Sequence, residues 1–173
     1  MKSLIRKVLF LNISILIATF VFIAGCQQQK PDPSQELKTL VDKYIEVWNN
    51  GNLSELDAIM DSNYVHHSNQ SPDVDIDDLK KVISGFRTAY PDVKLVWEDE
   101  IYSENKSAGR WIFTGTNTGP GEMPPTGKSV RIWGESILHY ANGKITEEWT
   151  VYDNQSLMEQ LGYTMMPPSG TNQ

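Results

Sequence analysis

The sequence predicts an α+β domain, in which helices pack on one face of a curved antiparallel sheet. Apolar residues recur at helical spacing in the first half of the chain, and they alternate with polar residues in the second half. Asn142-Gly143 stands between two long alternating segments and is a strong signal for a hairpin. Helices followed by strands that pair as hairpins are typical of this class.

The first predicted helix begins behind Ser34, a good N-cap, and ends at Asn49-Asn50-Gly51. Its apolar positions form one stripe, made of Leu37, Leu40, Val41, Tyr44, Ile45 and Trp48. The segment Leu53–Met60 fits a second, short helix, and Tyr64–His67 fits a brief strand.

A third helix is expected to start at a cap formed by Asp75 or Asp77 and to stop before Pro91, which cannot continue a helix. Strands and a closing helix follow it. The predicted ranges are the strands Val93–Tyr102, Ala108–Thr116, Lys128–Tyr140 and Lys144–Asp153, the loop Asn117–Gly127, and the helix Asn154–Leu161.

The hairpin at 142–143 can be read for side-chain direction, because strand residues alternate between the two faces of a sheet. Unbroken pairing puts Glu147, Trp149 and Asp153 on the same face as Leu138 and other apolar residues, which is expected to face the helices. A carboxylate there must be paired or have a raised pKa, so Glu147 and Asp153 become candidates for acid–base chemistry. Two alternatives stay open: Glu147 pairs with a cation at the rim, and Asp153 caps the following helix.

The chain begins with a basic segment and an apolar, uncharged run, Val8–Ile23, that leads to Ile23-Ala24-Gly25-Cys26. The run is short for a membrane-spanning helix and fits a secretory signal. The residues before Cys26 resemble the lipobox of bacterial lipoproteins, in which the cysteine is lipidated. The expected organisation is a signal peptide over 1–25, a polar tether over 26–33, one domain over 34–163 and a frayed tail over 164–173, with the domain exported and membrane-anchored through Cys26.

Charge and cysteine content exclude some functions. The chain carries a net charge of −7, so nucleic acid is not an expected partner. Its 1 cysteine allows neither an internal disulfide nor a cysteine-based zinc site. His66 and His67 with a distant acid fall short of the three or four ligands that zinc needs, so no metal is predicted.

Four motifs in the second half of the chain resemble the SnoaL-like family, which includes the ester cyclases of polyketide biosynthesis. They are Gly115-Thr116-Asn117-Thr118-Gly119, Pro124-Pro125-Thr126-Gly127-Lys128, Gly143-Lys144-Ile145-x-Glu147-x-Trp149-x-x-x-Asp153, and Gln160-Leu161-Gly162. The resemblance covers about residues 34–163. It implies a nuclear transport factor 2-like cone, with helices on the concave face of the sheet, an apolar pocket and no cofactor.

The resemblance also implies roles for individual residues. Asp153 stands where ring-closing members have a general base that removes a proton next to a carbonyl, and His139 stands where a histidine assists. Asn117 replaces a histidine that is common at its position, and Asn cannot titrate. Either His66 or His67 is expected to face the pocket, because neighbouring strand residues point to opposite sides.

Three functions are consistent with these features. The first is a cofactor-independent cyclase or isomerase that acts on a small carbonyl compound, with Glu147 and Trp149 lining the pocket. The second is an anchored lipoprotein that binds a small apolar molecule or a partner without chemistry. The third is an epoxide hydrolase of the limonene type, for which Arg110 would be the arginine between two acids. A homodimer is also expected, through the outer sheet face that carries Trp133, Ile137 and Tyr152.

Overall fold

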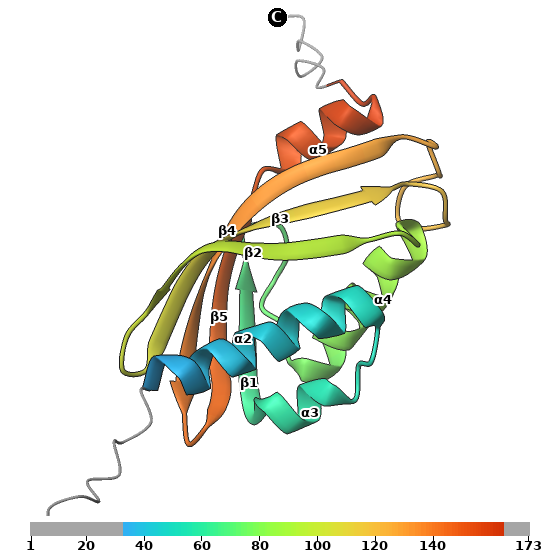
Figure 1. Cartoon of the computed structure of the whole chain (residues 1–173). Helices are drawn as coiled ribbons and strands as arrows, with labels where there is room; N and C mark the ends of the chain where they lie inside the picture. The colour runs from blue at the N-terminus through green and yellow to red at the C-terminus, as the bar shows by residue number, and fades with distance from the viewer. Residues whose placement is uncertain (1–32, 165–173) are drawn as a thin grey trace, which may run out of the picture. The chain divides into compact units, whose positions relative to one another are not determined.

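The computed structural model describes residues 33–164, and these residues form helices and strands in the predicted order (Figure 1). The predicted signal peptide, the lipidated Cys26 and residues 165–173 lie outside the described residues. The elements are α2 (Pro33–Asn50), α3 (Glu55–Ile59), β1 (Met60–Ser68), α4 (Ile76–Ala89), β2 (Lys94–Tyr102), β3 (Lys106–Thr116), β4 (Ser129–Ala141), β5 (Lys144–Tyr152) and α5 (Asn154–Leu161).

The strands form one curved sheet in the order β1-β5-β4-β3-β2. Figure 1 shows α2, α3 and α4 on one side of this sheet, while α5 follows the end of β5. The predicted α+β class and cone are confirmed. The pairing of β1 adds one feature: this strand runs parallel to β5, whereas the other neighbours are antiparallel.

Most helix ends agree with the capping chemistry of the sequence, but α2 begins at Pro33, so Ser34, the expected N-cap, lies within the helix. Gly51 follows α2 with φ +79°, and the guanidinium of Arg87 donates to the carbonyl oxygens of Trp48 and Asn49 at 2.7 Å. A cation there stabilises the C-terminal end of α2. The choice between two caps for α4 is settled in favour of Asp75, whose side chain accepts from the Asp78 amide at 2.9 Å.

The β4–β5 hairpin turns at the predicted place, but the register of its two strands changes just after the Tyr140–Ile145 pair. Asn142 and Gly143 have φ values of +52° and +72°, as a two-residue hairpin turn requires. Tyr140 then pairs with Ile145 as expected, but His139 pairs with Glu147, so Thr146 is left over as a bulge. The predicted side-chain directions are correct for β4 and for Ile145. They are wrong for every residue of β5 beyond the bulge.

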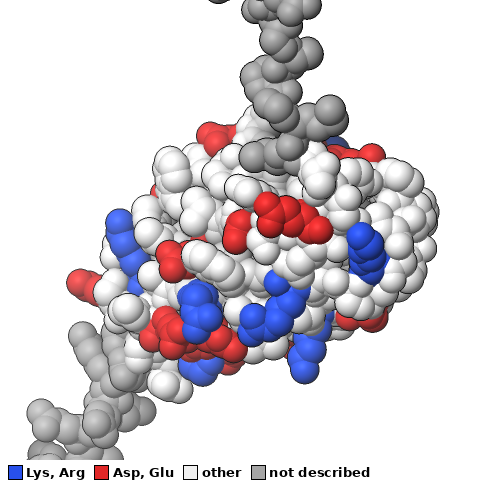
Figure 2. Space-filling model, turned by 90° about the horizontal axis from the view of Figure 1, so that it is seen from above, with Lys and Arg blue, Asp and Glu red and all other residues white. Residues whose placement is uncertain are grey.

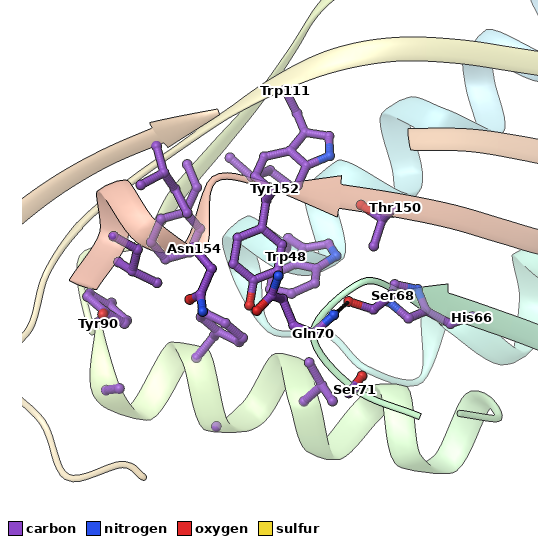
Figure 3. A pocket seen from close by; sticks show the side chains of 18 of the residues that line it. Trp48, His66, Ser68, Gln70, Ser71, Tyr90, Trp111, Thr150, Tyr152 and Asn154 are labelled. Carbon is purple, nitrogen blue, oxygen red and sulfur yellow. Dashed lines mark hydrogen bonds between the residues drawn. The ribbon is translucent and has the colours of Figure 1, made fainter. Parts of the chain in front are cut away.

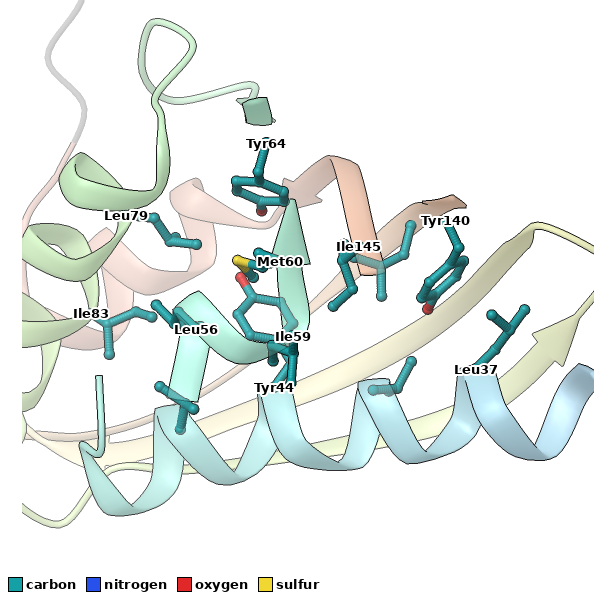
Figure 4. Close-up of a cluster of buried hydrophobic side chains, with 13 residues drawn as sticks. Leu37, Tyr44, Leu56, Ile59, Met60, Tyr64, Leu79, Ile83, Tyr140 and Ile145 are labelled. Carbon is teal, nitrogen blue, oxygen red and sulfur yellow. The ribbon is translucent and has the colours of Figure 1, made fainter. Parts of the chain in front are cut away.

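Two clusters of buried apolar side chains hold the domain together. The first joins α2, α3 and α4 to β1, β4 and β5 (Figure 4), with members Leu37, Val41, Tyr44, Val47, Leu56, Ile59, Met60, Tyr64, Leu79, Ile83, Leu138, Tyr140 and Ile145. The second joins β2, β3 and β4 to α5, with members Tyr90, Val93, Leu95, Phe113, Val130, Ile132, Leu157 and Leu161. Burial of these side chains supplies the main driving force for folding.

The surface carries both signs of charge. Figure 2 shows one face of the molecule, on which Lys and Arg side chains lie among Asp and Glu side chains. None of the helices between residues 33 and 164 is long and apolar enough to cross a membrane.

Candidate functional site

A cavity of about 560 Å³ lies between the sheet and helices α2, α4 and α5 (Figure 3). Its size falls in the range of small-molecule sites. Most of its wall is apolar or aromatic, formed by Ile45, Trp48, Val82, Phe86, Tyr90, Leu95, Trp97, Trp111, Phe113, Met123, Ile132, Tyr152, Leu157 and Met158. Such a wall favours an apolar ligand.

Two of the wall's tryptophans lie over glycines of the sheet. A Cβ at Gly109 would overlap the indole of Trp97, and a Cβ at Gly134 would overlap the indole of Trp111. Each glycine therefore lets a flat ring lie against the strand backbone. The sequence places glycine inside both strands, and the structure shows the reason.

The polar end of the cavity is built around the carboxylate of Glu148 on β5. Glu148 is 3% exposed, and three groups converge on its Oε2 atom. The hydroxyl of Tyr44 donates at 2.8 Å and that of Tyr64 at 3.0 Å, while Nδ1 of His66 lies at 3.2 Å. A buried carboxylate with this many partners is strongly stabilised in place.

Burial and the contact between Glu148 and His66 have opposite effects on the pKa values of these two residues. Burial alone would raise the pKa of Glu148, but His66, Ser136 and Tyr44 outweigh it and hold that pKa below its usual value. Burial alone would lower the pKa of His66, but the adjacent Glu148 carboxylate and the charge of Asp73 outweigh it and raise that pKa. The two shifts agree on an ionised Glu148 beside a more basic His66. Burial and the Glu148 charge raise the pKa of Tyr44 and Tyr64, so both keep their protons.

A chain of hydroxyl groups extends this polar region along the sheet. The Ser136 hydroxyl donates to the Thr150 hydroxyl at 2.9 Å, and it accepts from Nε1 of Trp111 at 3.1 Å. These three residues also line the cavity. The cavity therefore has one polar strip on an otherwise apolar sheet face.

The arrangement can move a proton. Since Nδ1 of His66 faces Glu148, the ring's other nitrogen, Nε2, is the one left for a bound molecule. The carboxylate fixes the ring and stabilises its protonated form, as the acid does in an Asp-His pair of a hydrolase.

The structure answers which of the two adjacent histidines faces the cavity. His66 points inward to Glu148 and lines the cavity. His67 points outward, where its Nε2 lies 3.0 Å from Glu147 and its Nδ1 lies 2.9 Å from Asp73. Its ring stacks on Trp149, with centroids 3.9 Å apart.

Three predicted site residues lie on the outer face of the sheet, and the bulge is the reason for the two that belong to β5. Glu147, Trp149 and His139 do not line the cavity. Glu147 lies between His67 and His139, at 2.5 Å from Nδ1 of His139, and these partners lower its pKa against the opposing effect of burial. The inward direction predicted for Glu147 and Trp149 is therefore wrong, because the extra residue, Thr146, reverses the alternation.

Asp153 lies at the start of α5 and caps it. Its carboxylate accepts from the Ser156 amide at 2.9 Å, and its own amide donates to the Trp133 carbonyl. It borders a second recess rather than the wall of the main cavity. Strand alternation predicts Asp153 among apolar residues, and this prediction is wrong because the register changes at the bulge. The alternative prediction, that Asp153 caps the following helix, is confirmed.

Of the other two predicted pocket residues, Arg110 lies outside the cavity and Asn117 lies in its wall. Arg110 lies on the outer face of β3, where it pairs with Asp99 and Glu98, so it forms no acid–arginine–acid group in the cavity. Asn117 does line the cavity, but its side-chain oxygen is taken by the amide and the hydroxyl of Thr126, at 2.8 and 3.1 Å. It fixes the loop that follows β3.

The sequence prediction missed Glu148, Tyr44 and Tyr64 as site residues. Tyr44 enters the prediction only as a member of an apolar stripe and Tyr64 only as the start of a strand, and unbroken alternation from Glu147 turns Glu148 to the outer face. The available signal was the pair Glu147-Glu148 opposite the pair His66-His67, which allows one His–Glu contact on each face. Between residues 33 and 164, no group of three or more His, Cys, Asp or Glu residues is placed to hold a metal ion.

Comparisons with known proteins agree with this fold. Residues 38–161 match the family model described as SnoaL-like polyketide cyclase. None of the curated proteins matches the chain.

Solved structures resemble the chain over most of its length. AclR from Streptomyces galilaeus, a candidate hydroxylase, is 27% identical with a TM-score of 0.68, covering 79% of this chain and 87% of its own. A candidate polyketide cyclase from Bacillus cereus is also 27% identical, with a TM-score of 0.65 and coverage of 76% and 87%. A candidate SnoaL-like polyketide cyclase from Jannaschia is 18% identical, with a TM-score of 0.69 and coverage of 81% and 100%, and it supports the fold alone.

Proposed function

The chain belongs to the SnoaL-like polyketide cyclase family. We propose that it is a cyclase or isomerase that moves a proton from one position of a small carbonyl compound to another. The observation that carries this proposal is the buried Glu148–His66 pair at the polar end of an apolar cavity. Perturbed, mutually oriented acid–base groups in a cavity are the usual mark of such a site.

In this proposal His66 is the residue that exchanges the proton. Its Nε2 accepts a proton from the carbon next to the carbonyl and returns it at another position, so the reaction needs no cofactor. Glu148 remains ionised and stabilises the protonated ring, while Tyr44 and Tyr64 hold the carboxylate in position.

Other cavity residues match the carbonyl group and the apolar remainder of the proposed substrate. The amides of Gln70 and Asn154 and the hydroxyl of Ser71 lie on the lining, where they can donate to a carbonyl oxygen that gains charge. The aromatic wall suits an uncharged, apolar remainder. Asp153, the base implied by the family resemblance, is assigned here to capping α5.

The test is catalysed hydrogen–deuterium exchange, which needs no knowledge of the natural substrate. The purified full chain is incubated in D₂O with a panel of aryl ketones and β-diketones, and loss of the α-proton signal is followed by NMR. We expect exchange above the buffer rate, with His66→Gln and Glu148→Gln lowering it by on the order of 10²–10⁴-fold. Asp153→Asn is the matched control and should stay within a few-fold of wild type, because Asn caps a helix as well as Asp.

A second candidate is a binding lipoprotein without catalysis. It is favoured by the three protein groups that already contact one oxygen of Glu148, as in a purely structural network. Ketone binding without any exchange above the buffer rate would support this function and contradict the enzyme.

We also propose that the domain acts outside the cytoplasm, anchored to a membrane of the cell envelope through lipidated Cys26. The support is the lipobox-like Ile23–Cys26 behind an uncharged apolar run. Mass spectrometry of the protein isolated from its native membrane checks this, and an unmodified Cys26 contradicts it.

A further inference from the structure

His67, on the outer face of β1, lies between two carboxylates. Its Nδ1 atom is 2.9 Å from Oδ1 of Asp73, and its Nε2 atom is 3.0 Å from Oε1 of Glu147. A neutral imidazole has a single N–H, so its other nitrogen would direct a lone pair at a carboxylate oxygen. Only the protonated ring, with an N–H on each nitrogen, attracts both carboxylates. The geometry is therefore that of a positively charged His67.

The aromatic neighbour of His67 also favours this charge. The imidazole stacks on the indole of Trp149, with ring centroids 3.9 Å apart and planes inclined by 21°. The face of an aromatic ring is its negative side, so it attracts a positive ring that lies on it. Two more histidines lie close by: His139 contacts the second oxygen of Glu147, and His66 points to the opposite face of the sheet. Neither takes a contact away from His67.

Asp73 belongs to a segment that forms part of the cavity wall. Residues 69–75 connect β1 to α4, and they leave the sheet where β1 ends at the cavity (Figure 3). Gln70 and Ser71 of this segment line the cavity. In the proposed function they are two of the groups that donate to the carbonyl oxygen of the substrate. The position of the segment therefore decides whether these donors reach a bound molecule.

The segment is tied to the sheet at Val74 and at Asp73. The backbone of Val74 pairs with that of His66 through N–H···O bonds of 2.9 and 3.1 Å. One residue earlier, the side chain of Asp73 pairs with His67. This side chain is 63% exposed, so the ion pair is weak and can open while the rest of the domain stays folded.

Loss of the proton from His67 would free Asp73 rather than Glu147. The neutral ring keeps one N–H, which can serve only one of the two carboxylates. Glu147 lies within the sheet on β5 and is also held by His139, whereas Asp73 lies in a connecting segment and is the more exposed of the two. The remaining N–H therefore stays with Glu147.

We propose that His67 is a positioning residue, whose charged ring holds the segment 69–75, and with it Gln70 and Ser71, closed against the cavity, and which releases the segment when it loses its proton as pH rises. The inference rests on the proposed function in so far as it assigns Gln70 and Ser71 to the substrate. It adds a pH-dependent control of the site from the opposite face of the sheet.

The test is amide hydrogen exchange of the full chain, read by water-exchange NMR, and it needs no ligand. The reporter is the amide of Val74, which donates to the His66 carbonyl when the segment is closed. Its protection, corrected for the intrinsic pH dependence of amide exchange, is compared at pH 5.5 and pH 8.5. The proteins are wild type, Asp73→Ala, Glu147→Gln and a control, Asp42→Ala.

Asp42 is the matched control because its carboxylate resembles that of Asp73 in exposure. It is 60% exposed and pairs with Lys38 within α2, and it does not line the cavity. We expect wild type and Asp42→Ala to lose about 2- to 5-fold in protection between pH 5.5 and pH 8.5, which suits the small free energy of an exposed ion pair. Asp73→Ala should show the lower protection at both pH values.

Glu147→Gln separates the two charge states of His67 most sharply. The Gln amide can donate to Nε2 of a neutral His67, which leaves the Nδ1–H for Asp73. This variant should therefore keep the higher protection of Val74 at both pH values. It also retains His66 and Asp73, so a pH effect that came from His66 would persist in it.

Two exchange results would overturn the inference. One is protection of Val74 that does not change with pH in wild type. The other is protection that falls equally in wild type and in Glu147→Gln. Either result would mean that the charge of His67 does not hold the segment, and neither bears on the proposed function.

Binding of the uncharged fluorescent ketone Prodan to the same proteins tests the link to the site. It should weaken by about 2- to 5-fold wherever Val74 is less protected, because the donors Gln70 and Ser71 are then displaced. Equal binding despite a change in Val74 protection would overturn the positioning role alone. If wild type binds no Prodan at either pH, the proposed function loses its support, and the positioning role is lost with it.

Discussion

At the scale of single residues, the unusual feature of this protein is an ionised carboxylate buried next to a histidine. An uncompensated buried charge is costly, and Glu148 is tolerated because two tyrosine hydroxyls and His66 surround one of its oxygens. The pair therefore links the stability of the fold to pH.

The direction of this dependence follows from the two pKa shifts. The raised pKa of His66 stabilises the fold below about pH 6.5, the ordinary value for histidine, and that contribution is lost as pH rises through the folded-state value. The lowered pKa of Glu148 stabilises the fold above about pH 4.3, and that contribution is lost as pH falls through the folded-state value. The pair should stabilise the protein most between these two pH values.

We predict that His66→Gln lowers the free energy of unfolding by about 1.5–3 kcal/mol at pH 5.5, and by less at pH 8.5. The reason is that the substitution removes a charged partner of Glu148 at the lower pH and a mostly neutral one at the higher pH. Urea unfolding of both proteins at the two pH values measures the difference. Parallel pH profiles for wild type and variant would show that the pair does not contribute in this way.

At the scale of elements, the loop between β3 and β4 forms part of the cavity wall and depends on one side chain. Asn117 is 2% exposed, and its backbone also pairs with Gly127 and Lys128 at the loop's base. Its side chain holds Thr126, so the loop residues Gly121 and Met123 reach the cavity from a fixed base.

Asn117→Ala should therefore lower the free energy of unfolding by about 1–3 kcal/mol, because it leaves the Thr126 amide without its acceptor. Thr118→Ala is the control, since Thr118 is exposed and its hydroxyl makes only one long contact, 3.5 Å, with the Thr116 carbonyl. Hydrogen exchange of loop amides 118–127 should accelerate in the Asn117 variant alone. Equal exchange in both variants would mean that the loop is held by its backbone contacts.

At the scale of the whole molecule, the outer face of the sheet exposes several large apolar side chains. Trp133 and Ile137 of β4 are each 47% exposed, and Trp149 and Val151 of β5 are 52% and 49% exposed. Ile137 and Trp149 pair directly across the two strands, so the four residues share one area. Tyr152, which was expected on this face, lines the cavity instead.

We predict that this area is covered by a second copy of the chain, because monomers rarely expose large contiguous apolar patches. Light scattering should give a dimer for wild type at micromolar concentration and a monomer for Ile137→Lys. Tyr163→Lys is the control, since Tyr163 is an exposed residue that follows α5 and is not part of the sheet. A wild type that stays monomeric at high micromolar concentration contradicts the prediction.

The sequence by itself determined the helices, the strands, the hairpin turn and the inner face of β4. Each of these depends on residues that are close together in the chain: the stripe of α2, the cap at Asp75, the turn at Asn142-Gly143, and the alternation from Ile132 to Tyr140. Local periodicity and turn chemistry are sufficient for such features. The family motifs then led to the correct cone.

The tertiary structure alone decided which residues form the site. One extra residue, Thr146, reverses the faces of β5, so Glu148 replaces Glu147 in the cavity. Parallel pairing of β1 with β5 then turns His66, rather than His67, toward that carboxylate. Nothing local distinguishes the members of the pair Glu147-Glu148 or of His66-His67, because the two residues of each pair are chemically identical. Only the partners brought from α2 and β1, more than 80 residues away in sequence, stabilise one register over the other.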